Sequence, residues 1–212
     1  ETNQGLTAVA IGGAAGSTDQ GTGALAVGYG AGYTGQGVDT VAVGKSAGRT
    51  NQGVSAVAVG ESAGYTTQSA NAVALGFEAG KTTQGNSAVA IGKEAGETTQ
   101  GTKAVAIGSL AGKVNQGNEA VALGNLAGFG NQAANSIIIN ATGTMLDNIV
   151  ADTFVVKPVR NATMTTILGY DAGTGEVTHN AVIPGYTNTA DLKALVAAST
   201  DFADYQTRIA AL

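Results

Sequence analysis

The amino-acid sequence predicts a mainly β protein: a parallel β-solenoid of 16-residue coils, then a small β connector and a C-terminal helix. A glycine, an Ala-Gly pair and a glutamine each recur every 16 residues, from about residue 1 to residue 139, without an insertion. Gly accounts for 33 of the 212 residues, yet it lacks the every-third-residue spacing of collagen. The glycines are Gly12, Gly28, Gly44, Gly60, Gly76, Gly92, Gly108 and Gly124, and the glutamines are Gln4, Gln20, Gln36, Gln52, Gln68, Gln84, Gln100, Gln116 and Gln132.

Each unit has the composition of strands and turns rather than of a helix. Helical repeats need about 33 residues and leucine-rich repeats at least about 20. Residues 8–11 alternate Ala-Val-Ala-Ile, which is typical of a short strand, and the Ala-Gly pair that follows suits a turn because Gly tolerates positive φ. A second extended piece follows around residues 18–20, and Gly21 turns the chain back. One unit therefore forms one coil, with neighbouring coils about 4.8 Å apart.

Aliphatic and alanine columns run along the predicted strands. We favour the orientation in which the aliphatic side chains fill the coil and the alanines face outward, where they let neighbouring chains approach; the reverse orientation stays open. A coil this thin buries few apolar side chains, so a lone stack leaves an apolar face in water. A closed threefold arrangement covers that face in every copy, which predicts a homotrimer. The aliphatic columns begin Val9, Leu25, Val41, Val57 and Ile11, Val27, Val43, Val59.

Two polar columns repeat with the same step. The glutamines predict a ladder in which each amide hydrogen-bonds its copy one coil away. Threonines recur from Thr18 to Thr98, and both columns fit satisfied polar groups that fix the register. An ice-binding face is a further hypothesis for the threonines, but it needs two regular columns, and the neighbouring one, which includes Asp19 and Gly35, is mixed.

The repeat ends at residues 136–140, where Asn140 replaces the expected glycine. A strand-like run follows at residues 154–160. Residues 165–170 and 176–178, joined by a Gly-containing loop, predict a β-hairpin. We therefore expect the repeats to form a head over residues 1–139 and the connector to span residues 140–186.

The last segment changes from a strand pattern to a helix pattern. From Thr189, a suitable N-cap, the chain runs to its end without Gly or Pro. Apolar residues then recur at spacings of three and four, which predicts a trimeric coiled coil over residues 187–212. Because the chain begins without Met and the helix runs to the last residue, we expect a longer or processed protein. The apolar residues are Leu195, Ala198, Phe202, Tyr205, Ile209 and Leu212.

The A-V-A-I-G segments at residues 88–92 and 104–108 carry a family resemblance. They resemble the YadA-like head repeat of trimeric autotransporter adhesins, whose heads are left-handed parallel β-rolls. The 16-residue unit is longer than usual there and is more similar to repeats in phage and large-virus fibre proteins. The resemblance covers about two thirds of the chain. It implies a left-handed, homotrimeric, non-enzymatic attachment fibre on a virion, which binds a host-cell surface receptor or glycan. A bacterial adhesin head and a purely structural spacer are the alternatives.

The residues suggest no catalytic, cofactor or metal site. There is no Cys, and His179 is the only His. The loop between Asp171 and Glu176 lacks the alternating oxygen ligands of a calcium loop. The net charge of −5 gives no reason to expect nucleic acid, and no apolar run approaches the length of a membrane span. Asn140 and Asn161 each begin an Asn-Ala-Thr glycosylation pattern.

Variable turn positions are the remaining candidates for binding. Two such columns carry aromatic side chains among charges, which is what a receptor or glycan site uses. A solvated surface under little constraint is the alternative. The candidate receptor contacts are Tyr29, Tyr33, Tyr65 and Phe77.

Overall fold

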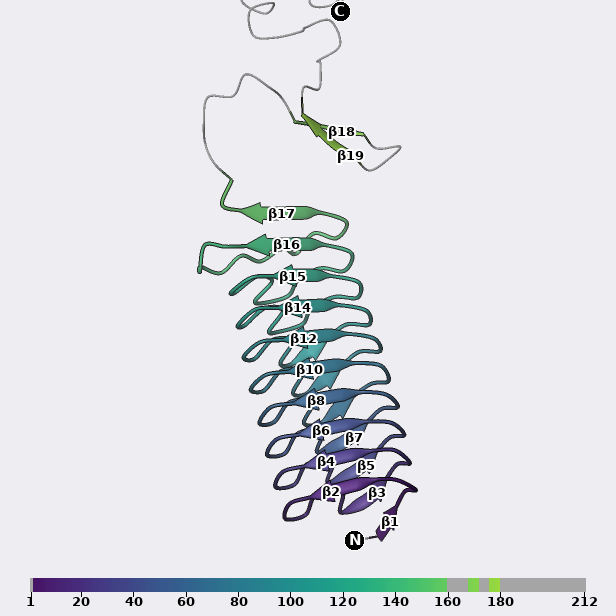
Figure 1. Cartoon of the computed structure of the whole chain (residues 1–212). Coiled ribbons are helices and arrows are strands. Elements are labelled where there is room, and N and C mark those ends of the chain that lie inside the picture. The colour runs from purple at the N-terminus through teal and green to yellow at the C-terminus, as the bar shows by residue number, and fades with distance from the viewer. Residues whose placement is uncertain (1, 160–167, 172–175, 180–212) are drawn as a thin grey trace, which may run out of the picture. The chain divides into compact units, whose positions relative to one another are not determined.

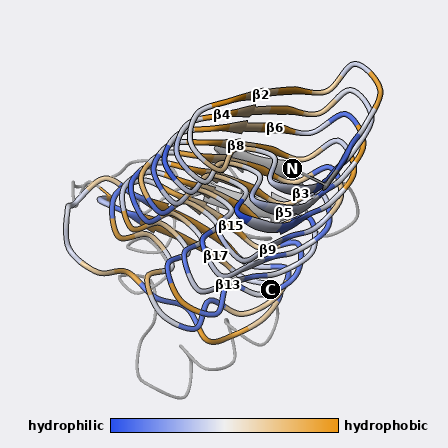
Figure 2. Cartoon of the chain, turned by 90° about the horizontal axis from the view of Figure 1, so that it is seen from below, coloured by the Kyte–Doolittle hydropathy of each residue, from blue (hydrophilic) through white to orange (hydrophobic). Residues whose placement is uncertain are grey.

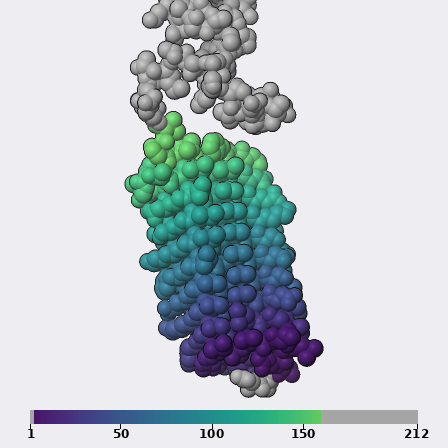
Figure 3. Space-filling view, in the orientation of Figure 1, coloured from purple at the N-terminus to yellow at the C-terminus, as the bar shows by residue number. Residues whose placement is uncertain are grey.

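The computed structural model describes residues 2–159, 168–171 and 176–179 of the chain. The chain divides into two compact units, Glu1–Val159 and Arg160–Leu212. The first unit is a stack of flat coils, each of which lies directly on the one before it (Figure 1). In the space-filling view the coils appear as parallel rows that follow the residue order (Figure 3). The predicted parallel β-solenoid is confirmed.

Two parallel sheets form the walls of the coils. Each strand pairs with the strand one coil away at a spacing of 16 residues, as in Val41 with Val57 and Gln36 with Gln52. The first sheet has seven strands: β1 (Thr2–Gln4), β3 (Thr18–Gln20), β5 (Thr34–Gln36), β7 (Thr50–Gln52), β9 (Thr67–Gln68), β11 (Thr83–Gln84) and β13 (Thr99–Gln100). The second has ten: β2 (Val9–Ile11), β4 (Leu25–Val27), β6 (Val41–Val43), β8 (Val57–Val59), β10 (Val73–Leu75), β12 (Val89–Ile91), β14 (Val105–Ile107), β15 (Val121–Leu123), β16 (Ile137–Asn140) and β17 (Phe154–Lys157).

The alanines, not the larger aliphatic side chains, fill the coils. In β4, Ala26 is fully buried, whereas Leu25 and Val27 on either side of it remain partly exposed. The favoured orientation of the strands was therefore wrong, and the reverse one holds. Each regular coil already encloses three small side chains, nearly all of them alanines, and one glutamine, so the larger aliphatic side chains face outward. Figure 2 shows the resulting apolar strands β2, β4 and β6 along one side of the coil stack.

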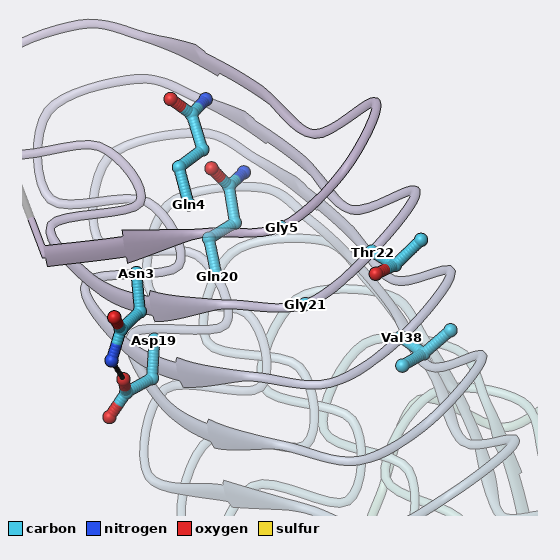
Figure 4. A pocket seen from close by; sticks show the side chains of 8 residues that line it. All are labelled: Asn3, Gln4, Gly5, Asp19, Gln20, Gly21, Thr22 and Val38. Atoms are coloured by element: carbon cyan, nitrogen blue, oxygen red, sulfur yellow. Dashed lines mark hydrogen bonds between the residues drawn. The ribbon is translucent and has the colours of Figure 1, made fainter.

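The glutamine ladder is present and lies inside the coils. From Gln36 to Gln132 each amide Nε2 donates to the Oε1 of the next glutamine at 3.1–3.3 Å. The same Nε2 of Gln68 also donates across the coil to the carbonyls of Val57 and Ala72. Figure 4 shows the first members, Gln4 and Gln20, projecting in the same direction from β1 and β3. The ladder thus ties one sheet to the other and each coil to the next.

Two glycine positions explain why the turns repeat so strictly. At Gly28, φ is +128°, and a Cβ would lie 2.7 Å from the carbonyl oxygen of Gly44 in the next coil. At Gly32, φ is +53°, and a Cβ would lie 2.6 Å from Gln36 Oε1. The first glycine lets the coils approach each other, and the second leaves room for the buried glutamine amide.

The strands of the seven-stranded sheet become shorter in the coils where threonine occupies the position directly before the glutamine. Asp19 and Asn51 adopt a positive φ there, and their strands β3 and β7 have three residues. Thr67 and Thr83 do not, and β9 and β11 have only two residues. A β-branched side chain disfavours the left-handed conformation, whereas Asn and Asp tolerate it.

The solenoid continues past the end of the 16-residue repeat. Ile138 takes the inward position of the alanines, and β17 pairs in parallel with β16 at a spacing of 17 residues, as in Ile137 with Phe154. Asn140, at the expected glycine, is buried, and its Nδ2 donates to the carbonyls of Asn125 and Thr144. The connector that we expected from residue 140 therefore begins with a further, irregular coil.

The second unit contains the expected hairpin. Strands β18 (Leu168–Asp171) and β19 (Glu176–His179) pair antiparallel, with Tyr170 opposite Val177. The helix predicted over residues 187–212 lies outside the described residues. In the part of the chain that the structure describes, no helix is long and apolar enough to cross a membrane.

Candidate functional site

The outer face of the ten-stranded sheet is the first candidate surface. Two side chains of each strand point out of the coil, and nearly all are Val, Ile or Leu. Leu75, in the middle of the sheet, is 44% exposed, and Ile11 near the N-terminal end is 59% exposed. We call this surface the aliphatic face. It follows ten strands, or roughly 43 Å at a strand spacing of about 4.8 Å.

The aliphatic face is unusual for a monomeric protein. Monomeric proteins rarely expose a contiguous apolar patch larger than a few hundred Å². This face carries no charged side chain from β2 to β16. In contrast, the charged side chains of residues 3–139 lie on the turns, apart from Asp19 in β3. The face is therefore suited to contact another apolar surface rather than water.

The second candidate surface is a ladder of side chains on one turn. Tyr33, Arg49 and Tyr65 occupy the same position in successive coils, and we call them the Tyr-Arg-Tyr ladder. The Arg49 guanidinium carbon lies 5.3 Å from the centre of the Tyr33 ring and 5.4 Å from that of Tyr65. Its Nη1 also donates to the Tyr65 hydroxyl. The structure thus brings together two of the predicted contacts, Tyr33 and Tyr65, around an arginine to which the sequence assigned no role.

The other two predicted contacts, Tyr29 and Phe77, lie in the adjacent turn column. Both are exposed, at 69% and 43% respectively. They are three coils apart, and the Lys45–Glu61 ion pair, with an N–O distance of 2.9 Å, occupies the two coils between them. Tyr33 and Tyr65 are therefore linked through Arg49, whereas Tyr29 and Phe77 are separated from each other, and the four residues do not form a single strip.

Further along the same turn the charges neutralise each other. Lys113 Nζ lies 2.6 Å from Glu94 Oε2, 3.2 Å from Glu97 Oε2 and 5.7 Å from the centre of the Phe129 ring. The hydrogen bond from Lys113 lowers the pKa of the Glu94 carboxyl below its ordinary value of 4.5, and the same bond raises the pKa of Lys113. Lys81 pairs with Glu78 at 2.8 Å.

The end of the stack where β1 lies has an open hollow of about 500 Å³ (Figure 4). Its lining includes Asn3, Gln20, Thr22 and Val38, and Asp19 is its one ionisable residue. Asn3 Nδ2 donates to Asp19 Oδ1 at 2.8 Å. A single carboxylate beside a solvated edge offers neither a nucleophile with a base nor a set of metal ligands.

The described residues offer no metal site, and one of the two glycosylation patterns is closed by burial. Among residues 2–159 and the two hairpin strands, no three His, Cys, Asp or Glu residues come close enough to hold a metal ion. Asn140, the first residue of one glycosylation pattern, is buried, and its Oδ1 accepts hydrogen bonds from the amide and the hydroxyl of Thr142. Its amide is therefore closed to modification in the folded chain. Asn161 lies outside the described residues.

Comparisons with protein-family models, with curated proteins and with solved structures found no match to this chain.

Proposed function

We propose that this chain is a non-enzymatic attachment fibre of a virus or phage, which assembles as a homotrimer and binds a host-cell surface receptor or glycan. The observation that carries the proposal is the aliphatic face, which one chain leaves in water along ten strands. The resemblance to YadA-like head repeats adds the left-handed roll and the threefold symmetry. The C-terminal coiled coil is part of the proposal because apolar residues recur at spacings of three and four from Leu195 to Leu212.

Copies of the same chain are the best partners for the aliphatic face. Its side chains repeat once per coil, so two copies placed side by side match each other in every coil. From β2 to β16 the face has no charged group that would select a different partner. A closed threefold arrangement buries the face of each copy and leaves the turns free for a ligand. Three weak sites on one rigid rod then bind a cell surface by multivalency.

Two measurements test the proposal. Light scattering after size exclusion should give about 62 kDa, three times the 20.7 kDa of one chain. A stable monomer would contradict the proposed trimer and the proposal that the aliphatic face joins copies of the chain. The labelled chain should also adhere to cells of some type in a panel of bacteria and eukaryotic cells. A trimer that adheres to none would instead favour the structural spacer, which the regular, uninterrupted stack of coils also suits.

A further inference from the structure

Arg49 differs from the other cations of the turns in its partners. Lys45, Lys81, Lys93, Lys103 and Lys113 each lie within 4.0 Å of a glutamate oxygen. Arg49 has no such carboxylate partner among the described residues; its neighbours are two aromatic rings and a phenol hydroxyl. The positive charge of Arg49 is thus held in place by groups that do not neutralise it.

Only one N–H group of the Arg49 guanidinium has a hydrogen-bond partner among the described residues. A guanidinium stacks on rings through its two flat faces, while its five N–H groups point outward in its own plane. One of them donates to the Tyr65 hydroxyl. A carboxylate suits the remaining edge, because its two oxygens accept a pair of parallel N–H bonds from a guanidinium.

The backbone holds this arrangement in a fixed register. The amide of Thr34 donates to the carbonyl of Arg49 at 2.9 Å, and the amide of Thr50 donates to that of Tyr65 at 3.0 Å. Since both rings also confine the arginine side chain, little conformational entropy remains to be lost when a ligand binds.

We propose that the Tyr-Arg-Tyr ladder binds the carboxylate of an acidic sugar residue in a cell-surface glycan. This proposal rests on the attachment function proposed above and names the ligand class for it. One unneutralised cation between two aromatic rings fits a ligand that carries single carboxylates on rings rich in C–H groups. A polyanion such as nucleic acid needs several adjacent cations, and this chain has a net charge of −5.

The same column supplies an internal control. Lys113 also lies over an aromatic ring, that of Phe129, but Glu94 and Glu97 neutralise its charge. If any cation on an aromatic ring sufficed, Lys113 would bind the same ligand. The proposal for the Tyr-Arg-Tyr ladder requires that Lys113 does not bind the ligand.

The test is biolayer interferometry of the whole chain against polymers that carry sialyllactose, glucuronate, lactose or sulfated lactose. We expect binding to at least one of the two carboxylate polymers, weaker binding at high salt, and none to lactose. Arg49→Gln should weaken binding about tenfold or more, and Arg49→Lys, which keeps the charge but loses the paired bonds, should weaken it less. Lys113→Gln should bind like the unchanged chain. Circular dichroism melting of each variant checks that the solenoid is intact.

Several results would overturn the proposal. They are equal binding of the lactose polymer, binding of sulfated lactose alone, no binding of either carboxylate polymer, or unchanged binding by a folded Arg49→Gln variant. A trimer that adheres to cells but ignores both carboxylate polymers would refute the ladder and leave the attachment function standing. A trimer that adheres to no cell would refute the attachment function itself.

Discussion

At the scale of single residues, the solenoid depends on the absence of side chains as much as on their presence. Gly32 and Gly30 belong to the same turn and both have a positive φ, +53° and +65°. A Cβ at Gly32 would meet Gln36 Oε1 at 2.6 Å, whereas a Cβ at Gly30 has only Ser46 Oγ, at 3.7 Å. Other coils already carry serine at the position of Gly30, as at Ser46 and Ser62.

The two glycines should therefore respond differently to the same substitution. We expect Gly32→Ser to lower the free energy of unfolding by about 2–4 kcal/mol, because the buried glutamine must move away from its hydrogen-bond partners. Gly30→Ser should cost only about 1 kcal/mol, because the positive φ is unfavourable but no atom lies in the way of the side chain. Urea denaturation measures both. Equal losses would show that the backbone conformation, and not the space beside the ladder, makes the glycine necessary.

At the scale of the elements, ion pairs between turns link neighbouring coils. The pKa of Glu94 is lowered mainly by its hydrogen bond from Lys113, so this pair stabilises the fold fully above pH 4.5 and loses its effect as the pH falls below that value. The pKa of Lys113 is raised by the same bond, so the contribution is also lost as the pH rises above 10.5.

Replacing Glu94 should make the stability of the fold less dependent on pH in the acid range. We expect Glu94→Gln to lower the free energy of unfolding by at most about 1 kcal/mol at neutral pH and to reduce the loss of stability below pH 4.5. The matched control is Glu61→Gln, because the Lys45–Glu61 pair is far more exposed to solvent, at 65% and 47%. Thermal melts from acidic to neutral pH compare the variants. A Glu61→Gln variant with the larger effect would contradict this ranking.

The sequence was sufficient for the period of the elements but not for their orientation. The recurring glycines and glutamines predict coil length, register and ladder, because each depends on residues 16 positions apart. On hydropathy alone, Val9 and Ile11 were predicted to lie inside the coil. Hydropathy does not take the size of a side chain into account, so it did not predict that the smaller alanines fill the coil. The repeats themselves hold a clue: Val, Leu and Ile replace one another at the outward positions, while the inward Ala26 column is uniform until Ile138.

For the Tyr-Arg-Tyr ladder, too, the sequence predicts which residues share a column but not how their side chains interact. The period alone puts Tyr33 and Tyr65 in one column with Arg49 between them. Whether the arginine pairs with a carboxylate or stacks between the rings depends on rotamers and on the neighbouring turn, which a spacing does not specify. The same spacing places Lys113 near Glu97, and there the carboxylates pair with the cation.

At the scale of the whole molecule, the aliphatic face predicts how assembly can be broken without unfolding the chain. Leu75 and Phe77 are almost equally exposed in one chain, at 44% and 43%, but only Leu75 lies on this face. If the proposed trimer forms, we expect Leu75→Lys to shift the mass from about 62 kDa to the 20.7 kDa of one chain, because three ammonium groups would enter its apolar interface.

Phe77→Lys is the control and should leave the mass of the proposed trimer unchanged, since the side chain of Phe77 lies on the turn. Light scattering reports both masses, and circular dichroism reports whether each chain is folded. If the phenylalanine variant dissociates and the leucine variant does not, the turns rather than the aliphatic face join the copies.

The direction of the hydrogen bonds also has a mechanical consequence. In both sheets they run from coil to coil, along the direction in which the coils stack. A force that pulls the ends of this unit apart therefore loads one coil boundary at a time. Each released coil frees 16 residues, which extend to about 54 Å at about 3.4 Å per residue in place of a rise of about 4.8 Å. Single-molecule force spectroscopy should record a sawtooth with steps of about 50 Å, so that the rod yields in equal increments and dissipates a sudden load.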